Sequence, residues 1–164
     1  MGSLPESMIE YRKQLAKGYI KDAYRGLMEY IAKLRLYLAN KHPDYFVSGS
    51  INYGFMDYTY FYFFPKSLKK LNLKIVLLFI HDTATFEIWL AGYNKNVQTQ
   101  YWELFKESNW NEYHLAPTAK GTDYILNHTL ADNVDFGDLD ALTKQLEKGT
   151  LDFIKDIEDF LSEH

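Results

Sequence analysis

The sequence contains no cysteine, so the chain has no disulfide bond, no thiolate metal ligand and no cysteine nucleophile. Long apolar stretches are missing as well. The longest uninterrupted run of aliphatic and aromatic residues, Ile75 to Ile80, falls far short of the roughly 20 residues that cross a bilayer. We therefore expect a protein that folds in water and has no membrane partner.

Sequence signatures of common enzymes and cofactor sites are also absent. There is no Gly-x-Ser-x-Gly elbow, no phosphate-binding glycine loop, no dinucleotide fingerprint and no histidine pair at i, i+4 spacing. The nearest approach to a nucleophile site is Ser48-Gly49-Ser50, whose glycine instead indicates a bulge in a strand. His81-Asp82 is typical of a hairpin turn, and His114 of a solvated loop. The sequence thus predicts no cofactor and favours a protein that is not an enzyme.

Charge is distributed unevenly along the chain. Residues 1–72 contain eleven Lys and Arg and six Asp and Glu, which gives them a net charge of +5. Residues 73–164 contain seven Lys and Arg and sixteen Asp and Glu, which gives them a net charge of −9. Such surfaces are usually solvated or pair with each other, and without a dense basic stripe we do not expect a nucleic-acid partner. Residues 1–6 show neither a basic and apolar leader nor a myristoylation pattern, which predicts a cytoplasmic protein.

Apolar side chains at three- and four-residue spacing predict helices near both ends of the chain. Ser3-Leu4-Pro5-Glu6 is typical of a capping box and predicts a short helix to about Lys17, followed by a longer helix over 19–40. A middle helix is expected after Gly92-Tyr93-Asn94 and as far as about Lys106. The last helix is expected to start from an Asp138 cap and to continue almost to the end of the chain.

Between these helices, β-branched and aromatic residues are separated by turn-forming residues, as in β-strands. Strands are expected at about 45–53, 56–64, 73–80 and 85–91, with a fifth at 124–131, where a helix is the alternative. Short connections make neighbouring strands antiparallel. The predicted fold class is α+β, with a sheet of four or five strands and packed helices in one domain covering 1–164. Because 73–80 is almost entirely apolar, both of its faces must be covered, by helices or by a helix and a ligand or partner.

Five segments of the sequence resemble one protein family. They are YRGLMEY (24–30), YFVSGS (45–50), FEIWLAG (86–92), YWELFK (101–106) and FGDLDAL (136–142). Over nearly its whole length the chain resembles a family of small bacterial proteins recorded as a domain of unknown function. The resemblance implies a bacterial, intracellular protein of a single domain, and it brings no activity, cofactor or catalytic residue with it.

Two acidic residues, Asp57 and Glu87, interrupt predicted strands that are otherwise apolar or aromatic. Two carboxylates can hold a divalent cation that activates water for phosphodiester cleavage, so they define an alternative function as a metal-dependent, nuclease-like hydrolase, assisted by Lys74 or Lys95. That pattern usually places a lysine two residues after the second acid, where this chain has Trp89. The other interpretation is that each acid lies at a sheet margin or pairs with a basic side chain.

The most unusual feature that is present is aromatic: the chain has 14 Tyr, 11 Phe and 3 Trp. Alternation places Tyr58, Tyr60 and Tyr62 on one face of the 56–64 strand. With Trp89 and Tyr93 they would line a pocket for a planar ligand or a peptide side chain, unless helices cover this face. The leading prediction is a non-catalytic binding or interaction module with an aromatic-lined cleft. Its partner would be a small molecule or a protein, and a homodimer is one form of the latter.

Overall fold

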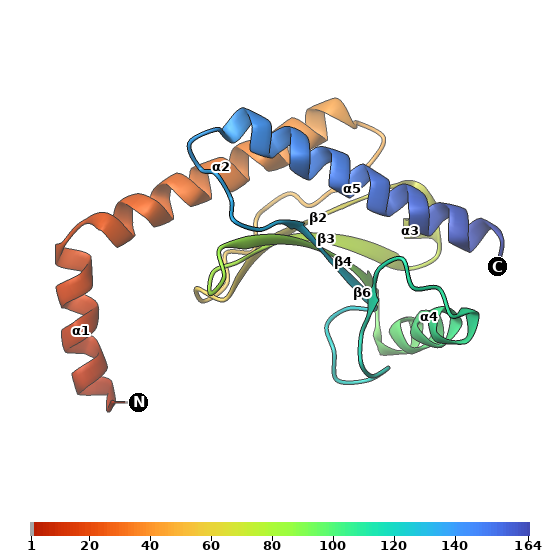
Figure 1. The fold of residues 1–164 in the computed structure, drawn as a ribbon, viewed down its shortest axis with the longest axis horizontal. Helices are drawn as coiled ribbons and strands as arrows, with labels where there is room; N and C mark the ends of the chain where they lie inside the picture. Colours follow the sequence, from red (N-terminus) through yellow and green to blue (C-terminus); the bar gives the residue numbers. More distant parts are fainter. Residues whose placement is uncertain (1) are drawn as a thin grey trace. The chain divides into compact units, whose positions relative to one another are not determined.

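The structure, a computed structural model, describes residues 2–164. Within that range it contains five helices and one antiparallel sheet of six strands, which confirms the predicted α+β class with a slightly larger sheet (Figure 1). The chain divides into two compact units, with the boundary between Tyr37 and Leu38. None of the helices in residues 2–164 has the length and apolar character needed to cross a membrane.

The first unit consists of helix α1 (Leu4–Ala16) and of helix α2 (Tyr19–Lys41) as far as Tyr37. The predicted capping box is confirmed: Ser3 Oγ accepts from the backbone nitrogen of Glu6 at 3.4 Å, and Glu6 Oε2 accepts from the backbone nitrogen of Ser3 at 2.8 Å. Gly18 separates the two helices with a φ of +85°, a left-handed conformation that costs glycine little.

The sheet lies in the second unit, with its strands in the order β1-β2-β3-β4-β6-β5. The strands are β1 (Phe46–Val47), β2 (Tyr58–Phe64), β3 (Leu73–Ile80), β4 (Thr85–Gly92), β5 (His114–Leu115) and β6 (Leu126–Ala131). The predictions for 73–80, 85–91 and 124–131 are confirmed to within two residues, and the last segment is a strand rather than a helix. The sequence pattern does not reveal β5, because this strand has only two residues and exists through its pairing with β6.

The first predicted strand, 45–53, is wrong over most of its length. Regular pairing with β2 ends after Val47 and returns only as an isolated bridge between Asn52 and Tyr60. Between them, Ser48 takes over the pairing, because its backbone nitrogen donates to the Tyr62 carbonyl at 3.1 Å and its Oγ accepts from the Tyr62 nitrogen at 3.0 Å. Between the Val47–Phe63 pair and the Asn52–Tyr60 bridge, the β1 side of the sheet contains more residues than the β2 side. Such an excess defines a bulge, as predicted at Ser48-Gly49-Ser50.

Strand β2 begins two residues later than the predicted start at residue 56. Gly54 and Met56 both have positive φ angles, +70° and +64°, so the backbone is still turning there. Asp57 holds the turn, because its Oδ1 accepts from the backbone nitrogens of Phe55 at 2.9 Å and Tyr58 at 2.7 Å. The prediction that Asp57 interrupts a strand is therefore wrong: this residue belongs to the turn before it.

Three further helices complete the second unit: α3 (Lys66–Lys70), α4 (Lys95–Ser108) and α5 (Leu139–Ser162). Helix α3 stands where the sequence indicates a turn. The Pro65 carbonyl accepts from the backbone nitrogens of Leu68 and Lys69 at the start of this helix, and the one buried residue of the helix is Leu68. Helices α4 and α5 confirm the predicted middle and C-terminal helices, and the Asp138 cap is present, with Oδ1 accepting from the Ala141 nitrogen at 3.1 Å.

Helix α5 lies across one face of the sheet (Figure 1). Its apolar stripe is buried and consists of Leu142, Leu146, Phe153, Ile154, Ile157 and Phe160. The helix continues through Gly149, where the absence of a side chain allows a close approach to β6: a Cβ at this position would lie 2.7 Å from Cδ2 of Leu130. Gln145 reinforces the contact by donating from Nε2 to the Leu130 carbonyl at 3.2 Å.

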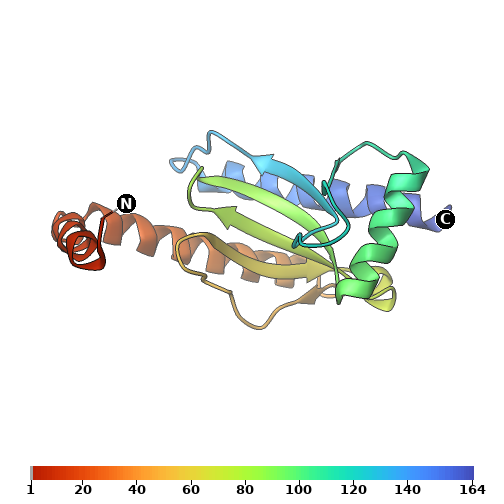
Figure 2. The ribbon, with the colours of Figure 1, turned by 90° about the horizontal axis from the view of Figure 1, so that it is seen from below.

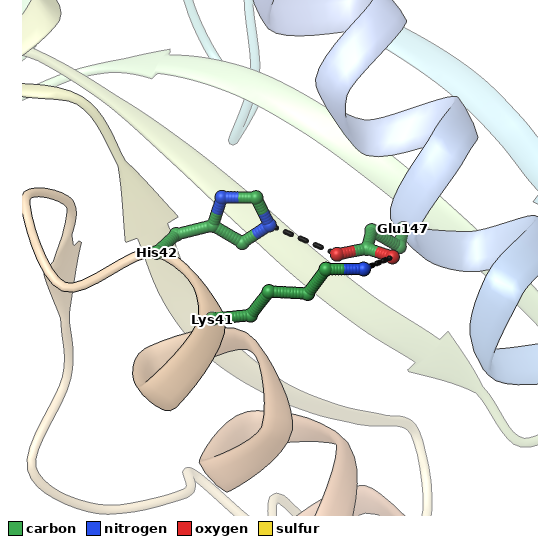
Figure 3. Close-up of polar contacts among 3 residues, drawn as sticks. All are labelled: Lys41, His42 and Glu147. Atoms are coloured by element: carbon green, nitrogen blue, oxygen red, sulfur yellow. Dashed lines mark hydrogen bonds and ion pairs between the residues drawn. The ribbon is translucent and has the colours of Figure 1, made fainter.

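A buried carboxylate connects α5 to the C-terminal end of α2. Among the described residues, Glu147 is the only charged residue that is buried. It accepts from Lys41 Nζ at 3.0 Å and contacts His42 Nε2 at 2.9 Å (Figure 3). Burial of a carboxylate raises the free energy of the folded state unless such partners replace the hydrogen bonds that water provided. This cluster is therefore a structural contact of the second unit.

Thr150, also on α5, gives a stability prediction. Its side chain is completely buried, and its Oγ1 has no hydrogen-bond partner among the described residues. A buried hydroxyl without a partner destabilises the fold, so Thr150→Val should raise the free energy of unfolding by about 1 kcal/mol. Urea denaturation followed by circular dichroism measures the change. In the control Thr143→Val, a hydroxyl that donates to the Leu139 carbonyl at 2.9 Å is lost, and no gain is expected. Equal effects in the two variants would contradict the prediction.

Candidate ligand-binding site

The sheet face opposite α5 carries the tyrosines of β2. In Figure 2 this face is turned toward the viewer, and α5 lies behind the strands. The strand register places Tyr62 and Trp89 on either side of Val76, and Tyr60 directly opposite Leu78. Because the aliphatic side chains of the central strand β3 are shorter than the aromatic side chains of β2 and β4, they form the floor of a groove between aromatic walls.

This groove encloses a cavity of about 330 Å³. Its lining consists of Tyr58, Tyr60, Tyr62, Lys74, Val76, Leu78, Trp89, Ala91 and Asp123. Four of the five residues predicted to line an aromatic cleft are among them. An apolar floor, aromatic walls and a few polar groups at one end are typical of small-molecule sites, and the volume lies at the lower end of their usual range of about 300–1,000 Å³.

Trp89 is held in a fixed orientation at one wall of the cleft. Its Nε1 donates to Glu87 Oε1 at 3.0 Å, and the same oxygen accepts from Asn127 Nδ2 at 3.5 Å. The edge-to-face ring of Tyr58, with its centroid at 5.6 Å, and the tilted ring of Tyr124, at 5.1 Å, pack against the indole. Such contacts restrict the rotamers of Trp89, so the wall is formed before any ligand arrives.

The opposite wall consists of Tyr60 and Tyr62. Their ring centroids are 5.8 Å apart in an edge-to-face arrangement, and the Tyr60 hydroxyl accepts from Asn52 Nδ2 at 2.9 Å. Burial and the neighbouring Tyr62 raise the pKa of Tyr60 above its ordinary value, so this phenol stays protonated at neutral pH. Lys74 Nζ lies 4.9 Å from the centroid of the Tyr62 ring, within the range of a cation–π interaction.

A comparison with protein-family models gives one match that covers almost the whole chain. Residues 4–161 match the family described as Domain of unknown function (DUF7000). The chain belongs to this family. The match confirms the resemblance found in the sequence, and the family description names no activity. No match was found among curated proteins or among solved structures.

In the DUF7000 chain, Asp57 and Glu87 lie in different surroundings. Asp57 is exposed in the turn before β2, where the backbone nitrogens of Phe55 and Tyr58 lower its pKa by hydrogen bonding to the carboxylate. Glu87 stands on β4, which β3 separates from β2, and its Oε1 is already engaged by Trp89 and Asn127. Residues 2–164 contain no group of three or more His, Cys, Asp or Glu side chains placed to hold a metal ion. In this geometry Glu87 positions the cleft wall.

The histidines singled out in the sequence lie away from the cleft. His81 lies in the turn between β3 and β4, as predicted, and burial lowers its pKa. Its Nε2 is 2.8 Å from Thr59 Oγ1, which itself donates to the Tyr53 carbonyl at 2.8 Å, so His81 is the donor in this pair. His114 is exposed, as predicted, but it lies on β5 and not in a loop, because it pairs with Asn127 of β6. Its Nδ1 is 2.7 Å from Asn127 Oδ1.

The loop before β5 packs toward α5 instead of toward the cleft. The Trp110 ring stacks on Phe160 with a centroid distance of 4.9 Å. The Tyr113 hydroxyl donates to Asp156 Oδ2 at 2.5 Å, and burial together with this acceptor raises the pKa of Tyr113. These aromatic residues are therefore part of the packing around α5.

Tyr93, the fifth predicted cleft residue, is 73% exposed and does not line the cavity. The sequence did not indicate that Lys74 and Asp123 form the polar end of the cleft, and Lys74 was predicted only as an assisting residue of the hydrolase alternative. One signal for its place in the cleft is that Lys74 is the only charged residue of the otherwise apolar strand β3. Asp123 belongs to an irregular loop, and no local sequence pattern places it beside Lys74.

Proposed function

We propose that this DUF7000 protein is a non-catalytic module that binds a small molecule in the cleft between Tyr60 and Trp89. One observation carries the proposal: aromatic side chains surround a cavity on the sheet face that α5 does not cover. Aromatic residues in a core usually pack against one another and leave no space of this size. We place the module in the cytoplasm of a bacterial cell, which the cysteine-free composition and the family resemblance favour.

The three tryptophans allow a direct test. Only Trp89 lines the cleft, whereas Trp102 Nε1 donates to the Ala116 carbonyl and Trp110 stacks on Phe160. Protein labelled with 5-fluorotryptophan should give three ¹⁹F resonances, which single Trp→Phe variants assign. Titration with a library of planar aromatic fragments should shift the Trp89 resonance and leave the other two in place, because only Trp89 would contact the fragment.

Two variants show whether the cleft residues are part of the fold. Tyr60→Ala and Trp89→Ala should remove fragment binding and keep a cooperative unfolding transition. Global unfolding of both would mean that these residues are core, and a library without any Trp89-specific shift would contradict the cleft. A dimer in light scattering that Trp89→Ala converts to a monomer would support a homodimer interface instead. Manganese binding that Asp57→Asn and Glu87→Gln both abolish would support the hydrolase alternative.

A further inference from the structure

A second cavity, of about 690 Å³, adjoins the aromatic cleft. The two cavities share Lys74, Ala91 and Asp123 in their linings. The walls of the second cavity come from the first turns of α4 and from the 119–123 loop. A single small molecule that extends past Ala91 would therefore contact residues of both cavities.

The second cavity is rich in positive charge. Lys74, Lys95 and Lys120 line it, against the one carboxylate of Asp123, which leaves an excess of two positive charges. None of these three lysines forms an ion pair with another described residue, since the ion pairs of the structure involve other bases. All four of these charged residues belong to residues 73–164, which have a net charge of −9, so the cavity is positive within an otherwise acidic part of the chain. Ammonium groups that outnumber the carboxylates in a cavity attract an anionic ligand group.

The walls of the second cavity are tied together by Gln98, which is only 9% exposed. Its Oε1 accepts from the backbone nitrogen of Gly92 at 2.8 Å, and its Nε2 donates to the Thr122 carbonyl at 2.8 Å. The end of β4, helix α4 and the loop are thereby joined at one side chain. A Cβ at residue 92 would lie 2.5 Å from the Gln98 backbone nitrogen, so only glycine permits this approach. The cavity is thus preformed, which lowers the entropic cost of binding.

Lys74 connects the two cavities chemically. Its ammonium group lies over the Tyr62 ring at the end of the aromatic cleft and also faces the second cavity. A ligand whose ring occupies the cleft would therefore have its anionic group within a few bonds of the ring. The N-terminal end of α4 adds positive partial charge on the same side.

We propose that the two cavities together bind an aromatic phosphate, a small molecule that carries a phosphate group on a planar ring, as aryl phosphates do, or on a sugar attached to that ring, as nucleoside monophosphates do. This inference rests on the proposed function and specifies its ligand. The ring lies between Tyr60 and Trp89 over Val76, and the phosphate accepts hydrogen bonds from the lysines. A phosphate monoester carries about −1.5 to −2 charges near pH 7, which balances the excess of two positive charges, whereas a carboxylate balances half of it.

The test compares matched ligands with and without the phosphate. Adenosine 5′-monophosphate with adenosine, and 1-naphthyl phosphate with 1-naphthol, are titrated against the ¹⁹F-labelled protein and by calorimetry. The phosphate member of at least one pair should bind about tenfold more tightly or better, as expected for a charge-assisted hydrogen bond to lysine, and should lose this advantage at high salt.

Lysine variants locate the phosphate. Lys95→Gln and Lys120→Gln should each reduce the advantage of the phosphate member severalfold and leave the neutral member unchanged, because neither lysine lines the aromatic cleft. Lys74→Gln should also reduce the advantage, and because Lys74 lines the cleft it can change the binding of the neutral member as well. Lys95 and Lys120 are exposed, so their replacement leaves the fold intact. Lys144→Gln, at an exposed position on α5 outside both cavities, is the control and should change nothing.

The outcomes separate this inference from the proposed function. If the neutral ligands shift the Trp89 resonance and the phosphates bind no more tightly, the cleft is a binding site and the phosphate inference is wrong. An advantage of the phosphate that survives all three lysine changes would also overturn it, because the anion would then lie elsewhere. If neither ligand pair nor the fragment library affects Trp89, both proposals fail.

Discussion

Phe153→Ala is expected to lower the free energy of unfolding by about 3–5 kcal/mol, the usual cost of removing a large aromatic side chain from a packed core. Phe153 is completely buried on the inner face of α5. Its ring packs edge-to-face against Tyr113, with centroids 4.7 Å apart, and is parallel to His128 at 6.4 Å. The loss of the ring therefore leaves a cavity between α5 and β6 that rigid neighbours cannot fill. Urea unfolding at neutral pH, followed by circular dichroism, measures the change.

The matched control for Phe153 is Phe55→Ala. Phe55 is 94% exposed in the turn before β2, so the same truncation there should change stability by less than about 0.5 kcal/mol. A loss below about 1 kcal/mol for Phe153→Ala would mean that α5 does not seal this face of the sheet. Similar losses in the two variants would have the same meaning.

Glu147→Gln is expected to lower the free energy of unfolding by about 2 kcal/mol, because the neutral amide loses charge-assisted contacts with Lys41 and His42. The expected loss is smaller than for two fully buried contacts, because the Lys41 side chain is half-exposed and solvent screens its interaction with Glu147. Glu147 itself has a side chain that is only 10% exposed. The contacts join parts of the chain that are more than a hundred residues apart, as Figure 3 shows.

Asp152→Asn provides the matched control for Glu147→Gln. It is also an acid-to-amide change on α5, and it also breaks an ion pair with a lysine, Lys148 Nζ at 2.7 Å. That pair is exposed on both sides, so its loss should cost less than about 0.5 kcal/mol. Unfolding of both variants in low and high salt completes the comparison, since only the exposed pair is well screened. Equal losses in the two variants would contradict the structural role given to Glu147.

Much of the fold follows from local patterns in the sequence. The caps at Ser3 and Asp138 and the apolar stripe of α5 are short-range signals, and the structure confirms them. The apolar run at 73–80 correctly predicts a strand buried on both faces. Toward the cleft, however, aromatic side chains of the two neighbouring strands surround this strand, an arrangement that the sequence pattern did not suggest.

The remaining features depend on contacts between distant residues. Alternation alone places Tyr58, Tyr60 and Tyr62 on one face, but only the pairing of β2, β3 and β4 brings Trp89 across Val76 from Tyr62. The 119–123 loop joins the site through Gln98, which no periodic pattern marks. For the same reason β1 is shorter than predicted: the Oγ of Ser48 replaces a backbone group, which residue preferences for strands do not foresee.

Strands β1 and β5, at the two edges of the sheet, also bear on how this protein behaves at high concentration. Each has only two residues. A long edge strand offers unpaired backbone groups on which another molecule can extend the sheet, whereas a two-residue edge offers almost no template. Beyond β1, the bulge at Ser48 interrupts the hydrogen-bonding pattern that an added strand would need. At β1 and β5, a chain with so many tyrosines and phenylalanines in its strands therefore offers little template for edge-to-edge aggregation.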